Sequence, residues 1–253
     1  FSYPGYSEAF CGFADDRVDS NNKVFNQNVT MFEWLHNKPA FKGKVAAFGA
    51  WELFPWILNQ PRAGFTVNAG YEPFRELSGS QSVGLINRLK AETAMWEGEA
   101  FDSFPFHTAL EYMKTRKPRL LYLSLGETDE WSHGGKYGDY LNAAARVDAY
   151  IKELWQTAQL MPEYRGKTTL VVATDHGRGE APVEWKSHGQ KIPDSKYVWL
   201  AVMGPDTKAL GERSKVEPVT QSQIAATIAA LLGEDYAGAV AKAGKPVQDV
   251  LSK

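Results

Sequence analysis

The sequence predicts an α/β fold with a mostly parallel central sheet and helices on both of its faces. Four short apolar runs, at residues 44–51, 119–125, 168–174 and 197–203, indicate buried strands. Segments with helical spacing separate these runs, and strands that alternate with helices favour parallel pairing. No linker divides the chain convincingly, so we expect a single domain over residues 1–253.

The segments between the strands supply the helices. In residues 140–160, apolar side chains recur every three or four positions, which is the spacing of a helix with one buried face. The helix expected at 220–232 ends before Gly233, a common C-terminal signal. The other segments of helical character are residues 29–36, 82–96 and 103–115.

Two stretches lack a clear period. The first 40 residues are rich in turn-forming residues, and residues 52–71 contain many aromatic side chains and prolines. We expect 52–71 to pack as an irregular segment over one face of the domain. Stacking of its aromatic rings on a base or aryl group of a ligand is the alternative interpretation.

Composition narrows the classes of function. The formal net charge is −2 and Lys and Arg are scattered, so no nucleic-acid-binding surface is indicated. Cys11 is the single cysteine in the sequence, which rules out an intramolecular disulfide. No apolar run approaches the ~18 residues that span a bilayer. Function must therefore be sought in individual residues.

Acidic residues and histidines follow two of the predicted strands. Asp175 and His176 come directly after the run 168–174, and Asp129 and His133 follow the run 119–125. The carboxyl ends of strands are where open α/β sheets place their ligands. Three of the five histidines in the chain belong to this group, because His188 follows in a later loop.

Together these five side chains offer two carboxylates and three imidazoles, which suit Zn²⁺ and also Mn²⁺ or Fe²⁺. One catalytic zinc usually takes three protein ligands, so the set indicates a two-metal site that still lacks one or two groups. Any single pair could instead be a helix cap with a hydrogen-bonded histidine. Two pairs at two strand ends disfavour that alternative. We interpret His36 and His107 as structural or surface residues.

Read in order, these motifs resemble those of the alkaline phosphatase superfamily, in particular its nucleotide pyrophosphatase/phosphodiesterase-like branch, the type I phosphodiesterases. In that branch a Ser or Thr nucleophile stands two positions before a proline, at the start of a conserved segment, and Ser2-Tyr3-Pro4 matches this spacing. Cys11 stands where the family usually has a second hydroxyl residue. The Asp-x3-His, Asp-His-Gly and His-Gly elements then follow in the family's order.

The resemblance implies an alkaline phosphatase-like three-layer sandwich that hydrolyses small-molecule phosphoric esters, as a phosphodiesterase or phosphatase, through a phosphoseryl intermediate. Ser2 would be the nucleophile, and Asn21, or its neighbour Asn22 as the alternative, would lie beside the non-bridging phosphate oxygens. Two divalent ions are implied, zinc first and manganese as the alternative. One ion would be held by Asp129, His133 and His188, and the other, next to Ser2, by Asp175 and His176.

The sequence departs from the family pattern at two places. The family has a further metal-ligating Asp at the end of a strand just before the nucleophile, whereas this chain begins at Phe1. We therefore expect the amino-terminal strand and its Asp to lie on a missing or separate segment. Tyr6 replaces the arginine of the sulfatase signature, which disfavours a sulfatase. The resemblance favours a periplasmic or secreted location.

Two other functions remain open at this stage. One is a cofactor-independent phosphosugar or phosphoglycerate mutase relative with two Mn²⁺ ions, although such enzymes usually carry inserted domains for which this chain is short. The other is a degenerate, non-catalytic metal-binding domain, since one expected carboxylate is absent.

Overall fold

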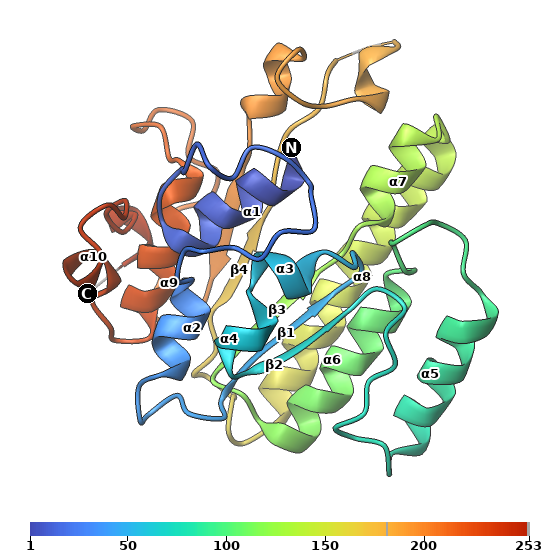
Figure 1. Ribbon diagram of the computed structural model, residues 1–253. Coiled ribbons are helices and arrows are strands. Elements are labelled where there is room, and N and C mark those ends of the chain that lie inside the picture. The colour runs from blue at the N-terminus through green and yellow to red at the C-terminus, as the bar shows by residue number, and fades with distance from the viewer. Residues whose placement is uncertain (181, 252–253) are drawn as a thin grey trace. The chain divides into compact units, whose positions relative to one another are not determined.

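The computed structural model describes residues 1–180 and 182–251, and within it the chain forms two compact units (Figure 1). Phe1–Asn22, Asn28–Met31 and Trp155–Lys253 make up one unit, which we call the terminal unit. Lys23–Gln27 and Phe32–Leu154 make up the other, the central unit. The single domain expected from the sequence stays a prediction.

The central unit is built on a parallel sheet of three strands in the order β2-β1-β3. Strands β1 (Val45–Gly49) and β3 (Leu120–Ser124) confirm two of the predicted runs, and both pairings are parallel as expected. Strand β2 (Thr66–Ala69) lies inside 52–71, where we expected irregular structure. At four residues, this strand is too short to show a period in the sequence.

The same segment also holds two short helices, α3 (Phe54–Ile57) and α4 (Gln60–Ala63). Each has a proline in its first turn, where a missing N–H costs nothing. The expectation of an irregular segment was therefore wrong. Its prolines mark helix starts rather than a break in the structure.

One face of the sheet packs against helix α6 (Ser103–Arg116). Helix α5 (Gln81–Glu92) packs against α6, and its Val83 belongs to the same buried cluster as Phe48 of β1. Side chains alternate between the two faces of a strand, and Phe48 on β1 lies opposite Leu123 on β3. The Phe48 ring contacts Tyr112 of α6, with ring centroids 5.3 Å apart. Both helices were predicted, and they form one outer layer of the unit.

The opposite face is covered by α2 (Met31–His36) and α3. The ring of Tyr122, which points to this face from β3, lies 5.6 Å from the ring of Phe32 and 5.6 Å from that of Phe54. The central unit therefore has three layers, with aromatic side chains filling both interfaces. Helices α7 (Glu127–His133) and α8 (Tyr137–Leu160) follow β3.

The terminal unit contains the antiparallel pair β4 (Leu170–Ala173) and β5 (Leu200–Met203). Both strands lie within predicted runs, but their antiparallel pairing differs from the mostly parallel arrangement that we expected. Among the described residues of the loop that joins them, the helical segments are two short 3₁₀ helices, η1 (Glu184–Lys186) and η2 (Pro193–Lys196), instead of a crossover helix. Without a crossover, consecutive strands pair antiparallel.

Helix α1 (Ser2–Cys11) packs in this unit against η3 (Gln221–Gln223) and α9 (Ile224–Leu231). Figure 1 shows α1 beside α9. The turn-rich composition of the first 40 residues did not indicate this helix, although proline is tolerated in a first turn. The remaining elements are α10 (Tyr236–Ala239) and η4 (Gln248–Val250). Among the described residues, no helix combines the length and the apolar character that a bilayer span requires.

Candidate functional site

Ser2 is the first residue of α1, and Asn21 lies beside it. The backbone N–H of Tyr3 donates to Asn21 Oδ1 at 3.0 Å. The first N–H groups of a helix have no partner within the helix, and they favour a negatively charged group at that end. Two sequence candidates, Ser2 and Asn21, are therefore neighbours at the amino-terminal end of α1.

The same helix end lies against Asp175, two residues after the end of β4. A Cβ atom on Gly5 would be 2.8 Å from the Asp175 carbonyl oxygen, so glycine permits this close approach. The Gln221 side chain donates to that carbonyl oxygen at 2.6 Å. Burial raises the pKa of Asp175, while His176 and a hydrogen bond from the Ser2 side chain act in the opposite direction. Ser2 and Asp175 thus lie side by side.

His176 and His188 complete this group. His176 Nε2 lies 3.3 Å from Asp175 Oδ2, and its Nδ1 is 2.9 Å from the carbonyl oxygen of Gly177. A carbonyl oxygen can only accept, so this contact assigns the ring proton to Nδ1 and leaves Nε2 as the nitrogen that can bind a metal. The His188 ring stacks on that of His176, with centroids 3.7 Å apart.

Gly177 fixes the course of the chain after this pair. Its N–H donates to the Ser195 carbonyl oxygen at 2.8 Å. A Cβ atom at this position would lie 2.5 Å from the carbonyl oxygen of Asp194 and would also overlap that of Tyr197. Neither carbonyl can rotate away as a side chain would, and the loop therefore requires glycine.

In the central unit, Asp129 and His133 occupy positions i and i+4 of α7, which places them on one side of the helix. Asp129 Oδ2 lies 3.2 Å from His133 Nε2. The structure thus brings the seven sequence candidates together as two sets. The terminal unit contains Ser2, Asn21, Asp175, His176 and His188, and the central unit contains Asp129 and His133.

Both acid–histidine pairs have the spacing of ligands that share one cation. Bonds of about 2.0–2.1 Å at a tetrahedral zinc place two ligand atoms ~3.3 Å apart. The oxygen–nitrogen distances are 3.2 Å in the Asp129–His133 pair and 3.3 Å in the Asp175–His176 pair. The donor atoms and their separations therefore fit a divalent cation such as Zn²⁺.

Helix α7 is held at its start by a buried carboxylate that the sequence did not indicate. Asp102 Oδ1 accepts from the N–H groups of Gly126, at 2.6 Å, and Glu127, at 3.2 Å. These are N–H groups that the first turn of a helix leaves without a partner inside the helix. Asp102 lies directly before α6 in the sequence but makes no side-chain cap hydrogen bond to that helix, and it caps α7 instead.

Further ionisable groups surround this carboxylate. Glu127 is buried, accepts from the Asp102 N–H at 2.9 Å, and forms an ion pair with Arg146. The Glu99 carboxylate is also buried and packs directly against Gly126. Burial, together with the nearby Glu127 charge, raises the pKa of Asp102 to about 7. The start of α7 therefore rests on a cluster of buried ionisable groups.

The loop after Asp175 also carries a cation that sequence reasoning did not identify. Arg178 is half-buried, and its Nη1 donates to the Trp185 carbonyl oxygen at 3.1 Å. Burial lowers the pKa of its guanidinium to about 10. The feature of the sequence that could have identified Arg178 is its position two residues after His176.

The chain matches the family model described as type I phosphodiesterase / nucleotide pyrophosphatase over residues 15–231. The matched range includes both acid–histidine pairs, His188 and Asn21. Ser2 lies before its first residue.

Two curated relatives are the human and mouse GPI ethanolamine phosphate transferase 1. The human protein is 24% identical over 214 residues, which is 82% of this chain and 21% of the relative. The mouse protein is 22% identical over 212 residues, with the same coverage. The chain thus matches about a fifth of the length of these relatives.

A solved structure with a similar fold is a protein in the alkaline phosphatase superfamily from Vibrio parahaemolyticus. The TM-score is 0.57 at 13% identity, and the match covers 93% of this chain and 55% of the other. At that identity the similarity concerns the fold, and it agrees with the α/β class predicted from the sequence.

Proposed function

The chain belongs to the type I phosphodiesterase / nucleotide pyrophosphatase family, within the alkaline phosphatase superfamily, and on this premise we propose that it is a metal-dependent enzyme that transfers a phosphoryl group from a phosphoric ester by way of Ser2. The observation that carries the proposal is the position of Ser2. It begins α1, beside Asn21, and its side chain hydrogen-bonds to Asp175 at the end of β4.

Asp175 and His176 are the proposed ligands of the ion nearest Ser2. Asp129 and His133 are the proposed ligands of a second ion, and the assignment of His188 to that ion rests on the order of the motifs in the sequence. Zinc suits this mixture of carboxylate and imidazole, with manganese as the alternative. When bound, such ions favour the deprotonated form of an oxygen nucleophile and neutralise charge on the phosphoryl group.

The protein groups would act in two steps. In the first, Ser2 Oγ forms a bond to phosphorus, the ester P–O bond breaks, and the alcohol leaves with a proton. In the second, an acceptor hydroxyl displaces Ser2 and restores its Oγ–H, so that covalent catalysis divides one difficult transfer into two. Since Asn21 Oδ1 already accepts from Tyr3, its Nδ2 is the group to donate to a non-bridging phosphate oxygen.

The acceptor distinguishes two candidate activities. With water as the acceptor the enzyme is a hydrolase, which is the function predicted from the sequence. With an alcohol as the acceptor it is a transferase. The human and mouse relatives are named ethanolamine phosphate transferases, and this favours the transferase as the second candidate.

A panel of aryl phosphate monoesters and diesters and an aryl sulfate, assayed with added Zn²⁺ or Mn²⁺, tests the proposal. We expect turnover of a phosphate ester, and a loss of roughly a thousandfold or more in Ser2→Ala with metal content unchanged. Ser78→Ala, which changes an exposed serine of the central unit, is the matched control. Full activity in Ser2→Ala would exclude Ser2 as the nucleophile.

Product analysis in the presence of glycerol then separates the two activities. A hydrolase releases inorganic phosphate or a monoester, whereas a transferase also forms a glycerol ester. Metal binding without turnover of any ester would favour the non-catalytic metal-binding domain.

A further inference from the structure

The central unit contains a cavity of about 350 Å³, a volume that suits a small-molecule ligand. Three aromatic side chains and two carboxylates are the chemically distinctive part of its lining. These are Phe25, Trp56, Tyr71, Glu52 and Glu72.

The cavity lies at the edge of the parallel sheet where its strands end. Ala69, the last residue of β2, is part of the lining, and the Glu52 N–H donates to the carbonyl oxygen of Gly98, also in the lining, at 2.7 Å. The next residue, Glu99, packs against Gly126 at the start of α7. The cavity and the Asp129–His133 helix thus follow strands that end at the same edge, where α/β folds bind their ligands.

The lining combines the two features that bind organic cations. Phe25 and Trp56 are stacked, with ring centroids 6.0 Å apart and planes at 16°, and Tyr71 adds a third ring. Aromatic faces attract ammonium groups, and the attraction is greatest for Trp. Glu52 and Glu72 supply negative charge at the same cavity.

An ammonium group of the chain itself already contacts this wall. Lys23 Nζ lies 2.7 Å from Glu52 Oε1 and 5.4 Å from the centroid of the Trp56 ring. Both contacts are those that a ligand ammonium would make. The carboxylate and the indole are therefore oriented to receive a cation.

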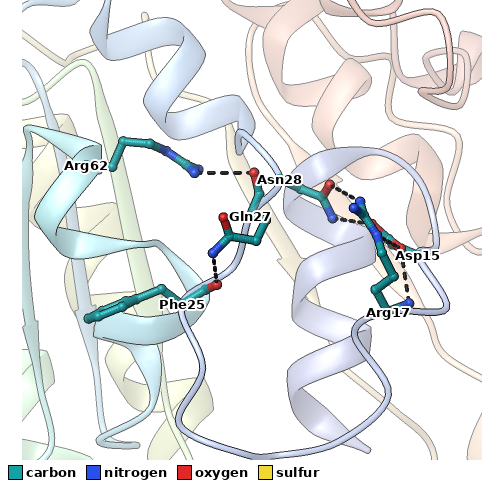
Figure 2. Close-up of polar contacts among 6 residues, drawn as sticks. All are labelled: Asp15, Arg17, Phe25, Gln27, Asn28 and Arg62. Atoms are coloured by element: carbon teal, nitrogen blue, oxygen red, sulfur yellow. Dashed lines mark hydrogen bonds and ion pairs between the residues drawn. The ribbon is translucent and has the colours of Figure 1, made fainter.

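The short segment that carries Phe25 is anchored within the central unit. Figure 2 shows the Gln27 side chain donating to the Phe25 carbonyl oxygen, at 2.9 Å, and Arg62 donating to the Gln27 carbonyl oxygen, at 3.3 Å. The Asn26 N–H also donates to the Trp56 carbonyl oxygen at 3.0 Å. These bonds hold Phe25 against Trp56 before any ligand arrives, which reduces the ordering cost of binding.

We propose that this cavity binds an organic ammonium group, either primary or methylated. The carboxylates distinguish this ligand from a neutral base or aryl group, for which the rings alone would suffice. Core packing, the main role expected for these aromatic residues, does not account for the cavity or the two carboxylates.

Direct binding tests the proposal without turnover. Calorimetry compares choline with 3,3-dimethylbutan-1-ol, which has the same shape but no charge, and ethanolamine with ethylene glycol. We expect at least one of the two cations to bind roughly tenfold more tightly than its neutral counterpart. Equal binding of both members of each pair, or no binding of either cation, would overturn the proposal.

Two variants then locate the site. Glu72 is exposed, so Glu72→Gln removes one charge without disturbing the core, and we expect it to weaken binding of the cation roughly fivefold. Glu92→Gln, at an exposed glutamate of α5 outside the cavity lining, is the matched control and should leave the affinity unchanged. An unchanged affinity in Glu72→Gln, with its thermal denaturation also unchanged, would place the cation elsewhere and overturn the proposal.

Lys23→Gln should change the affinity for the cation in the opposite direction to Glu72→Gln. It removes the internal ammonium from Glu52 and Trp56, so affinity for the cation should rise. A fall in affinity would contradict the proposed position of the ligand. Ser2→Ala should retain cation binding, and a failure of either proposal therefore leaves the other experiment informative.

Discussion

The terminal and central units hold their acid–histidine pairs by different means. In the terminal unit, neutral contacts fix the pair, because Gln221 donates to the Asp175 carbonyl oxygen and Gly177 donates to that of Ser195. In the central unit, Asp129 and His133 belong to a short helix whose start rests on the buried carboxylates of Glu99, Asp102 and Glu127.

This difference predicts different sensitivities. Buried charges respond to pH, because ionisation inside the protein loses the stabilisation that water would give. Backbone carbonyl oxygens do not titrate, but where they pack closely against a glycine they leave no room for an added side-chain atom. Changes of charge should therefore affect the central unit most, and changes of volume should affect the terminal unit most.

The largest effect is expected from pH acting on Asp102. Its pKa is raised to about 7 from 3.8, so the folded protein binds this proton more tightly than the unfolded chain does. The cost of ionising Asp102 is absent below pH ~4, grows between pH ~4 and ~7, and is complete above that range, at an upper limit on the order of 4 kcal/mol.

Denaturant unfolding of wild type and Asp102→Asn between pH 4 and 8 measures this cost. Asparagine keeps an acceptor oxygen for the Gly126 N–H but does not ionise. The free energy of unfolding of the variant minus that of wild type should therefore increase as pH rises. Parallel curves for the two proteins would show that Asp102 is not held in its protonated form.

A smaller effect, about 3 kcal/mol of destabilisation, is expected from Gly177→Ala in the terminal unit. The new methyl group would lie 2.5 Å from the Asp194 carbonyl oxygen, so the loop after β4 must move and carry His176 with it. Thermal denaturation measures the loss, and zinc content should fall together with it. A variant of wild-type stability and wild-type zinc content would show that this loop has room to adapt.

The smallest effects come from a matched pair of helical glycines. Gly5→Ala in α1 places a methyl group 2.8 Å from the Asp175 carbonyl oxygen, whereas a Cβ atom at Gly84 in α5 meets nothing within 4 Å. We expect Gly5→Ala to destabilise by about 1–2 kcal/mol and Gly84→Ala to stabilise by about 0.5–1 kcal/mol. Chemical denaturation of both variants checks the signs, and two stabilising changes would contradict the close approach of α1 to Asp175.

The sequence predicted the elements whose apolar pattern is long or strongly buried. Strands β1 and β3 and helices α5, α6 and α8 fall where their periods indicated. Strand β2 was missed because four residues carry almost no period. Helix α1 was missed because Pro4 and Gly5 suggested turns, although the contact with Asp175 selects Gly5.

The residues of the candidate site also differ in how far the sequence could predict them. Ser2 and the acid–histidine pairs were proposed because each lies in a motif with fixed spacing, and Asn21 was proposed because it lies about twenty residues after Ser2. Asp102 and Glu99 were not, since they support α7 through contacts between segments far apart in the chain. The cavity likewise joins Phe25 to residues 52–72, and only the fold brings those segments together.

The central claim is that two acid–histidine pairs, one in each unit, each bind a divalent ion. Metal content after dialysis against limiting zinc, measured for wild type, His133→Ala and His176→Ala, tests it most directly. We predict about two ions per wild-type chain and about one in each variant. A single ion in wild type, or two ions retained in either variant, would contradict the claim.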